Sequence, residues 1–435
     1  MTADGKRIGL AFSGGGYRAA SYHIGVLRTL HKLGILDKVD VISSVSGGSI
    51  TSAYYALHQQ DYNAFETGLI EKLQHGVLRN TITSAALLLL LLSFVCIALP
   101  LLIGAWSILG IISILLILYR WQFVLFPSSK YIEKKYNKLF FDGIVLSEIP
   151  ETPQLAINAT DIATGTLFTF SQKKSTCYAY EYDNDKPTNF KCNQFPLARA
   201  VMASSCVPHF FSPIQIGEEF QTLNKRDDIL LVDGGLYDNQ GAHKLVQSKS
   251  SYKTDYCIVS DAGNNELSAK GALNSVNMIL KTVDIMMKRI RTFQSSQNMY
   301  SQLYKNSRFA YISLRWKYEA DHLNRFVYNI KKGKIYQDVI DAHGITTEEV
   351  ERLRNEDLEI SQQAFHDIVS KVSANIGWEQ LSKSHPSDET HSLAKSVGTN
   401  LIALSQKKID ALIAHSEWLS EVQIRTYLPF LVQSN

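Results

Sequence analysis

The sequence lacks the charge imbalance and the cysteine framework that mark two common classes of protein. Its 435 residues contain 44 Lys and Arg against 41 Asp and Glu, a balance too even to hold a nucleic acid, so no nucleic-acid partner is expected. The five cysteines form no C-x-x-C pair, so neither a disulfide framework nor a zinc site is expected and a reducing compartment is predicted. No H-E-x-x-H pattern occurs, and we expect no metal and no other cofactor.

Two further absences concern the membrane. The amino-terminal stretch MTADGKRIGLAF is apolar over only a few residues before glycines intervene, so no export signal is expected there. Between Arg79 and Arg120, by contrast, 40 residues carry no charge at all, about twice the length of one membrane crossing. Pro100 and Gly104 favour a turn in the middle. We therefore predict an inserted transmembrane hairpin at residues 80–121, with helices at about 82–99 and 104–120.

The sequence does not decide how deeply the predicted hairpin enters the bilayer. A buried hairpin in a soluble core is the alternative, but such helices need a polar face and this segment is apolar on all sides. Its turn has no polar residue, so the hairpin either spans the bilayer or re-enters from the same side. Basic residues flank it, which predicts both ends and the catalytic domain on the cytoplasmic side; they are Lys72, Arg79, Arg120, Lys130, Lys134, Lys135 and Lys138. Aromatic residues expected at the interface are Trp106, Tyr119 and Trp121.

The rest of the chain alternates short apolar strands with helical segments. Strands are expected at residues 8–12, 39–43, 154–159, 229–232 and 256–260. This alternation predicts an α/β fold with a parallel sheet covered by helices on both faces. We expect one catalytic domain that the hairpin divides into residues 1–79 and 122–265, followed by a mostly helical part at 266–435.

One segment of the helical part has two interpretations. Apolar residues from Val276 to Ile290 recur at helical spacing, with Lys281, Lys288, Arg289 and Arg291 elsewhere on the helix. This pattern favours an amphipathic helix that covers the core, and the alternative is a helix that faces a membrane.

A glycine-rich turn follows the first predicted strand. Gly14, Gly15 and Gly16 open a helix that carries Arg18 in its first turn. Backbone amides and the helix dipole at such a position can bind an anion. The dinucleotide fingerprint G-x-G-x-x-G is met only in its tolerant form, because Ala19 stands at the last position.

Two more turns carry candidate reactive groups. Ser46 lies between a strand and a helix in S-V-S-G-G, similar to the nucleophile elbow G-x-S-x-G. Ser44 replaces the first glycine, and Ser43 and Ser44 are competing nucleophiles, but the spacing to Gly48 favours Ser46. A turn that only caps a helix is the alternative. Asp233 ends a strand before two glycines, where it can be a turn residue or a base.

In this order the three motifs resemble the patatin-like phospholipase family. In that family a G-G-G-x-R turn supplies the oxyanion hole, G-x-S-x-G the nucleophile and D-G-G the acid of a Ser-Asp dyad. The resemblance implies Ser46 and Asp233 as catalytic residues, with an oxyanion hole at Gly14, Gly15, Gly16 and Arg18. It covers about residues 5 to 265, including A-T-D at 159–161 and the stretch from Ala198 to Pro208. It implies a patatin-like sandwich of sheet and helices.

A dyad needs no histidine; His23, His209 and His243 are the nearest candidates for a triad. The resemblance and the predicted hairpin imply a membrane-anchored serine lipid acyl hydrolase of the phospholipase A type. Its expected partners are the lipid substrate and the bilayer. A lipid acyltransferase with the same dyad and a lipid-binding pseudoenzyme are the alternatives.

Overall fold

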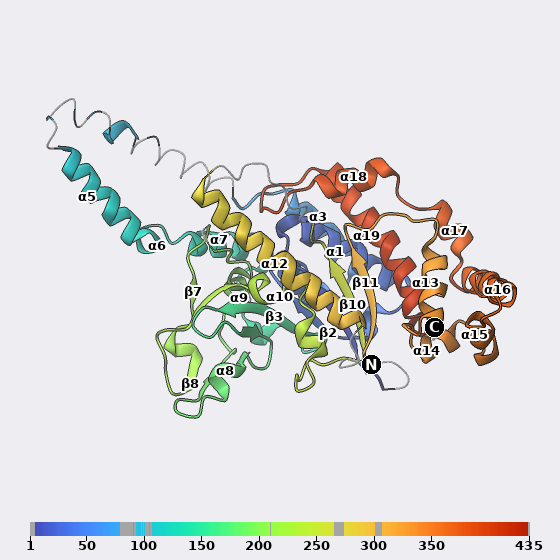
Figure 1. The fold of residues 1–435 in the computed structure, drawn as a ribbon. Coiled ribbons are helices and arrows are strands. Elements are labelled where there is room, and N and C mark those ends of the chain that lie inside the picture. Colours follow the sequence, from blue (N-terminus) through green and yellow to red (C-terminus); the bar gives the residue numbers. More distant parts are fainter. Residues whose placement is uncertain are drawn as a thin grey trace.

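The computed structural model describes residues 5–78, 90, 93–96, 98, 100, 104, 107–208, 210–264, 274–300 and 307–433. The central element is a nine-stranded sheet with helices packed on it (Figure 1). Its strands are β1 (Ile8–Phe12), β2 (Val39–Ser44), β3 (Gln154–Asp161), β4 (Leu167–Phe170), β5 (Thr176–Cys177), β7 (Ile214–Gln215), β9 (Leu230–Asp233), β10 (Tyr256–Asp261) and β11 (Arg308–Ser313). A separate ribbon pairs β6 (Thr188–Phe190) with β8 (Gln221–Leu223).

The sheet is mixed, which corrects the expectation of a parallel sheet. The strands β11, β10, β1, β2 and β3 lie side by side in parallel. The pairs β3–β4, β4–β5, β3–β9 and β7–β9 are antiparallel. Short connections explain the pairs β3–β4 and β4–β5, because antiparallel neighbours need only a turn whereas parallel neighbours need a crossover. Strand β9 returns to β3 over a long connection.

The antiparallel strand β9 decides where Asp233 lies. Strand β2 pairs with β3 as far as Ser44 and Ile157, and β9 pairs with the continuation of β3, with Asp233 opposite Ala159. Since β4 occupies the other edge of β3, β2 and β9 share one edge and run toward each other. The carboxyl ends of these two strands therefore meet head to head.

The helices divide into those that follow the early strands and those of the carboxyl-terminal part. The first group comprises α1 (Gly16–Lys32), α2 (Gly47–His58), α3 (Tyr62–Leu73), α5 (Ser107–Arg120), α6 (Gln122–Leu125), α7 (Ser128–Tyr136), α8 (Tyr178–Glu181), α9 (Leu197–Ser204), α10 (Gly235–Asp238) and α11 (His243–Val246). The second comprises α12 (Ser275–Tyr300), α13 (His322–Lys331), α14 (Gln337–Ala342), α15 (Thr347–Leu353), α16 (Leu358–Ile376), α17 (Trp378–Lys383), α18 (Asp388–Ser396), α19 (Gln406–Tyr427) and α20 (Phe430–Gln433).

Alternating side chains of the strands fill the core on the two faces of the sheet. In β1, Ile8, Leu10 and Phe12 pack in the larger cluster with α1 and α19, while Ala11 packs in a smaller cluster with Leu245 of α11. Successive residues of a strand point to opposite faces, so a continuous apolar run indicates a strand buried on both faces. The five strands expected from the sequence are confirmed, with ends that differ by no more than two residues.

The carboxyl-terminal helices are part of this core. Helix α19 lies along α1, where the Thr29 hydroxyl donates a hydrogen bond to the Glu417 carbonyl. The segment between α18 and α19 also bonds to the end of α3 and to the loop after it. The Leu404 amide donates to the Leu73 carbonyl, and the Val77 amide donates to the Leu401 carbonyl. Strand β11 joins the sheet as well. The part without a recognisable motif thus helps to hold the amino-terminal strands and turns.

The predicted membrane hairpin falls partly outside the described residues, which include only single positions and Ser93–Cys96 of its first helix. Its second helix is α5, which has no buried residue and projects from the body of the fold (Figure 1). Among the described residues, no single helix is long and apolar enough to cross a bilayer. Helix α5 meets that requirement only together with the segment Gln122–Phe141, across a bend of 75°.

Candidate active site

Ser46 stands at a sharp turn between β2 and α2. Its backbone has φ 51° and ψ −119°, a conformation that costs a residue with a side chain energy and that is common at functional sites. Glycines next to it permit this turn, because a Cβ at Gly47 would overlap the carbonyl of Gly16 and one at Gly48 would overlap that of Phe12. Helix α2 can therefore begin directly against the end of β1.

The carboxyl of Asp233 lies beside the Ser46 side chain. The carboxylate accepts a hydrogen bond of 2.7 Å from the Gly235 amide, and both residues are nearly buried, with exposures of 7% for Ser46 and 6% for Asp233. Burial raises the pKa of Asp233 to about 6, although the hydrogen bonds from Gly235 and the Ser46 side chain lower it. A carboxylate with such a pKa is a stronger base than an exposed one and is still mostly ionised at neutral pH.

The competing serines of β2 are held inside the fold. Ser44 accepts hydrogen bonds at 3.1 and 2.7 Å from the hydroxyls of Ser49 and Ser52. Ser43 accepts one at 3.0 Å from the side chain of Asn158. Both are fully buried, so the geometry singles out Ser46 at the turn.

The glycine-rich turn lies against Ser46. A Cβ on Gly14 would come within 3.2 Å of the Ser46 Cβ, and the Gly14 amide donates a hydrogen bond of 3.0 Å to the carbonyl of Asn239. The amides of Gly15 and Gly16 have no hydrogen-bond acceptor among the described residues. Of the three predicted oxyanion glycines, Gly14 is thus already engaged, while Gly15 and Gly16 keep donors for a ligand.

The Arg18 side chain stabilises the glycine-rich turn. Its Nε and Nη1 donate hydrogen bonds of 3.0 and 3.1 Å to the carbonyls of Ala262 and Val397. Burial lowers the pKa of Arg18 to about 10, although nearby Asp261 raises it. The side chain therefore connects the turn to β10 and to the end of α18, and the sequence alone did not show this structural task.

A buried serine that sequence reasoning missed connects the two candidate catalytic residues. The Ser46 amide donates a hydrogen bond of 2.9 Å to the Ser204 hydroxyl, which donates one of 2.6 Å to the Asn158 carbonyl. The Ser204 carbonyl accepts from the Gly234 amide at 3.3 Å. Ser204 thus contacts both the Ser46 turn and the Asp233 turn. Its signal was its place in the stretch from Ala198 to Pro208 that resembles the family.

The histidines proposed for a triad lie elsewhere or outside the described residues. His23 is fully buried, with Nδ1 2.7 Å from the Ser260 hydroxyl and Nε2 3.0 Å from the Ser13 carbonyl, and burial lowers its pKa to about 4. Burial also lowers the pKa of His243, whose ring contacts Tyr237. His209 is outside the described residues. Within the described chain no hydrogen bond joins a histidine to Ser46.

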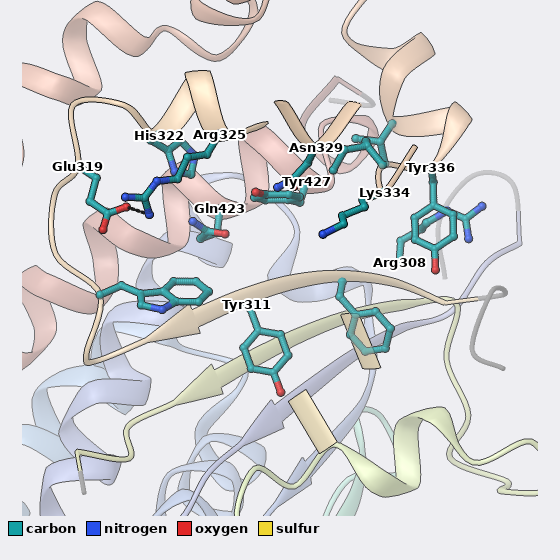
Figure 2. Close-up of a pocket in the computed structure, with 14 residues that line it drawn as sticks. Arg308, Tyr311, Glu319, His322, Arg325, Asn329, Lys334, Tyr336, Gln423 and Tyr427 are labelled. Carbon is teal, nitrogen blue, oxygen red and sulfur yellow. Dashed lines mark ion pairs between the residues drawn. The ribbon is translucent and has the colours of Figure 1, made fainter. Parts of the chain in front are cut away.

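A cavity of about 360 Å³ lies apart from this centre, at the edge strand β11. Figure 2 shows side chains of α13 and α19 on one side of it and Tyr311 on the other. Its charges are paired: Arg308 Nε lies 2.9 Å from the Asp338 carboxylate, and Arg325 is paired with Glu319 and Asp321. Neither Ser46 nor Asp233 lines it, so it is not the candidate active site.

Comparison with known proteins agrees with the motifs. The family model for patatin-like phospholipase matches residues 10–246, more than half of the chain. The protein therefore belongs to the patatin-like phospholipase family, and this membership supports a lipid acyl hydrolase activity.

Solved structures give distant similarities. Human GIVD cytosolic phospholipase A2 is 12% identical with a TM-score of 0.44, over 99% of this chain and 60% of that one. VipD from Legionella pneumophila is 13% identical with a TM-score of 0.29, over 95% and 91% of the two chains. The protein thus spans about 60% of the length of the human enzyme. A search of curated proteins gave no match.

Proposed function

We propose that the protein hydrolyses fatty-acyl esters of phospholipids or related lipids through a Ser46–Asp233 dyad and an acyl-enzyme. The observation that carries this proposal is a serine at a strained turn beside a buried carboxylate whose pKa is raised to about 6. Asp233 has no neutralising cation among its described hydrogen-bond partners, which are amides and hydroxyls. It is therefore free to accept a proton.

The proposed reaction has two halves. Ser46 Oγ attacks the ester carbonyl carbon as its proton passes to Asp233, and the amides of Gly15 and Gly16 stabilise the developing oxyanion. When the intermediate collapses, the bond to the alcohol breaks and Asp233 returns the proton to the leaving oxygen. A water molecule then attacks the acyl-enzyme with Asp233 again as the base, releasing the fatty acid and restoring Ser46.

The chemistry is tested by labelling with a fluorophosphonate and by identifying lipid products with mass spectrometry. We expect labelling of the wild type and of Ser44→Ala, no labelling of Ser46→Ala, and release of free fatty acid. Transfer of the acyl group to an alcohol instead of to water would identify an acyltransferase. An unlabelled wild type with intact lipid binding would identify a pseudoenzyme and refute the proposal.

The enzyme is further proposed to be anchored in a membrane by the hairpin at residues 80–121, with its catalytic domain on the cytoplasmic side. The support is the uncharged run and the apolar helix α5, which has no buried residue. Replacing Thr81–Trp121 by a short linker should release the protein from carbonate-washed membranes. Retention after carbonate treatment would place the anchor elsewhere.

The proposed topology predicts that both termini lie on the same side. Tags at residues 1 and 435 should be equally protected from protease in sealed vesicles. Opposite protection would mean a single crossing and would contradict a hairpin.

A further inference from the structure

Helix α12 lies over the candidate active site with one face. Met287 Cε comes within 3.3 Å of where a Cβ of Gly235 would stand, beside the Asp233 carboxylate. One turn later the buried Arg291 has Nη1 3.8 Å from Asp261 Oδ1, and Gln294 donates a hydrogen bond to the carbonyl of Tyr237. With 3.6 residues per turn, these positions form one inward-facing stripe.

The opposite face of α12 is exposed and mostly apolar, with Thr282 and Arg289 between its apolar residues. Met278, Ile279, Ile285, Met286 and Phe293 have exposures of 48%, 56%, 50%, 59% and 61%. They recur at intervals of seven residues, two turns of helix, so they share one side. A helix that only covers a soluble core presents polar residues to water. The sequence prediction of a cover helix agrees with the inner face, except that Arg291, expected on the solvated side, is buried there. The prediction does not account for the outer face.

We propose that this outer face, made of Met278, Ile279, Ile285, Met286 and Phe293, docks on the surface of a lipid bilayer. A bilayer fits a single exposed helix because the apolar face can enter the boundary between headgroups and acyl chains while the charged groups remain in water. Arg289 is exposed on the same side and Lys288 lies next to it, which suits anionic headgroups. Arginine at this depth can extend its charged end to the headgroups.

The position of α12 favours a bilayer over a second copy of the chain. In Figure 1 the amino-terminal end of α12 points toward the end of the molecule from which the apolar helix α5 projects. Two parallel copies of the stripe would also bring two Arg289 side chains together, which is unfavourable. Docking through the outer face would turn the covered Asp233–Gly235 turn toward the lipid, so the inference adds a second membrane contact to the proposed function.

The test measures the environment of single spin labels on α12 in the full-length chain. Ile279→Cys, Met286→Cys and Phe293→Cys probe the outer face, and Asp284→Cys is the matched control, exposed on the same helix but off the stripe. All carry Cys96→Ser, because the other four cysteines are buried. All also carry Ser46→Ala, so that vesicles of phosphatidylcholine and phosphatidylglycerol in equal amounts stay intact.

On addition of vesicles, we expect the three outer labels to become several-fold less accessible to a water-soluble nickel complex and more accessible to oxygen, with no change at residue 284. Unchanged nickel accessibility on the outer face would overturn the proposal. Protection without vesicles, together with dipolar coupling between labels, would overturn it in favour of a second copy. Because Ser46→Ala is inactive by design, a failure of the proposed catalysis cannot change this result.

A second measurement uses activity. Met286→Glu should lower hydrolysis of vesicle lipid several-fold while leaving hydrolysis of a soluble short-chain ester unchanged, and Asp284→Asn should change neither. Equal loss on both substrates would indicate a folding defect and count against docking. If the wild type hydrolysed neither substrate, the proposed function would fail while the labelling experiment still decided the docking.

Discussion

The candidate active site and the cavity beside β11 differ in how their charged side chains are paired. In the cavity each guanidinium has a carboxylate partner, as in the pair of Arg308 and Asp338. At the site, Asp233 is buried with only amide and hydroxyl donors among its described partners, and its pKa rises to about 6. Paired charges stabilise a fold without reactivity, whereas an unpaired buried carboxylate costs stability and gains basicity. The charges of the cavity are thus those of a structural feature, whereas the buried carboxylate of the candidate site is suited to act as a base.

The largest effect should come from removing the dyad. Ser46→Ala and Asp233→Asn should each lower kcat/KM on a short-chain ester by at least about a thousandfold, and the double variant should lose little more, since groups that act as a unit are not additive. Each variant is first shown to be folded by circular dichroism. Additive losses, or substantial turnover by Asp233→Asn, would reject the dyad and reopen the case for a histidine triad.

The second prediction concerns pH. A protonated Asp233 cannot accept the proton of Ser46, so kcat/KM should fall as the pH decreases through about 6, the raised pKa of this carboxyl. The measurement is a pH profile on a soluble ester between the acid limit of stability and neutral pH. An acid limb near 4, the pKa of an ordinary carboxyl, would show that Asp233 is not the titrating base.

The raised pKa of Asp233 should also make the free energy of unfolding depend on pH. A raised folded-state pKa means that the folded protein binds the proton more tightly, so this contribution favours folding at low pH and is lost as the pH rises through about 6. Asp233→Asn should therefore gain stability over the wild type with rising pH, by up to roughly 3 kcal/mol. Denaturant unfolding of both proteins at several pH values measures the difference, and a gap independent of pH would contradict it.

A smaller effect is expected from Ser204→Ala. Loss of the hydroxyl leaves the Ser46 amide without its acceptor. The substitution should lower kcat/KM about tenfold and lower the free energy of unfolding by about 1–2 kcal/mol. Ser205→Ala is the matched control, because its hydroxyl donates to the Val201 carbonyl within α9. If the two variants lose similar stability but only Ser204→Ala loses kcat/KM, Ser204 has a positioning role. Equal kcat/KM for the two variants would refute that role.

The smallest effect is predicted for a substitution in the cavity beside β11. Arg308→Met removes a partly exposed ion pair and the stacking of the guanidinium on Tyr336, so stability should fall by only about 0.5–1 kcal/mol. Ester hydrolysis should be unchanged, as thermal unfolding and kinetics on the same preparation would show. A large loss of activity would mean that the two regions are coupled and would break the comparison drawn between them.

The sequence by itself determined the local elements of the site. Continuous apolar runs marked the strands, and glycines marked the turns where backbone must approach backbone, as at Gly47 and Gly48. The order of the three motifs indicated the family that the family model then supported. These features depend on residues that are neighbours in the chain, so a short stretch of sequence contains the information.

Only the tertiary structure decided how the turns meet. The sequence suggested that Ser46 and Asp233 follow parallel strands, but β9 is antiparallel and approaches β2 head to head along β3. The sequence also could not show that Arg18 bonds to the carbonyls of Ala262 and Val397, or that Ser204 links the two turns. The outward apolar face of α12 was likewise hidden, since periodicity gives the faces of a helix but not which face the fold covers. Pairing direction, hydrogen bonds between distant segments and burial all arise from contacts across the chain, which no local pattern specifies.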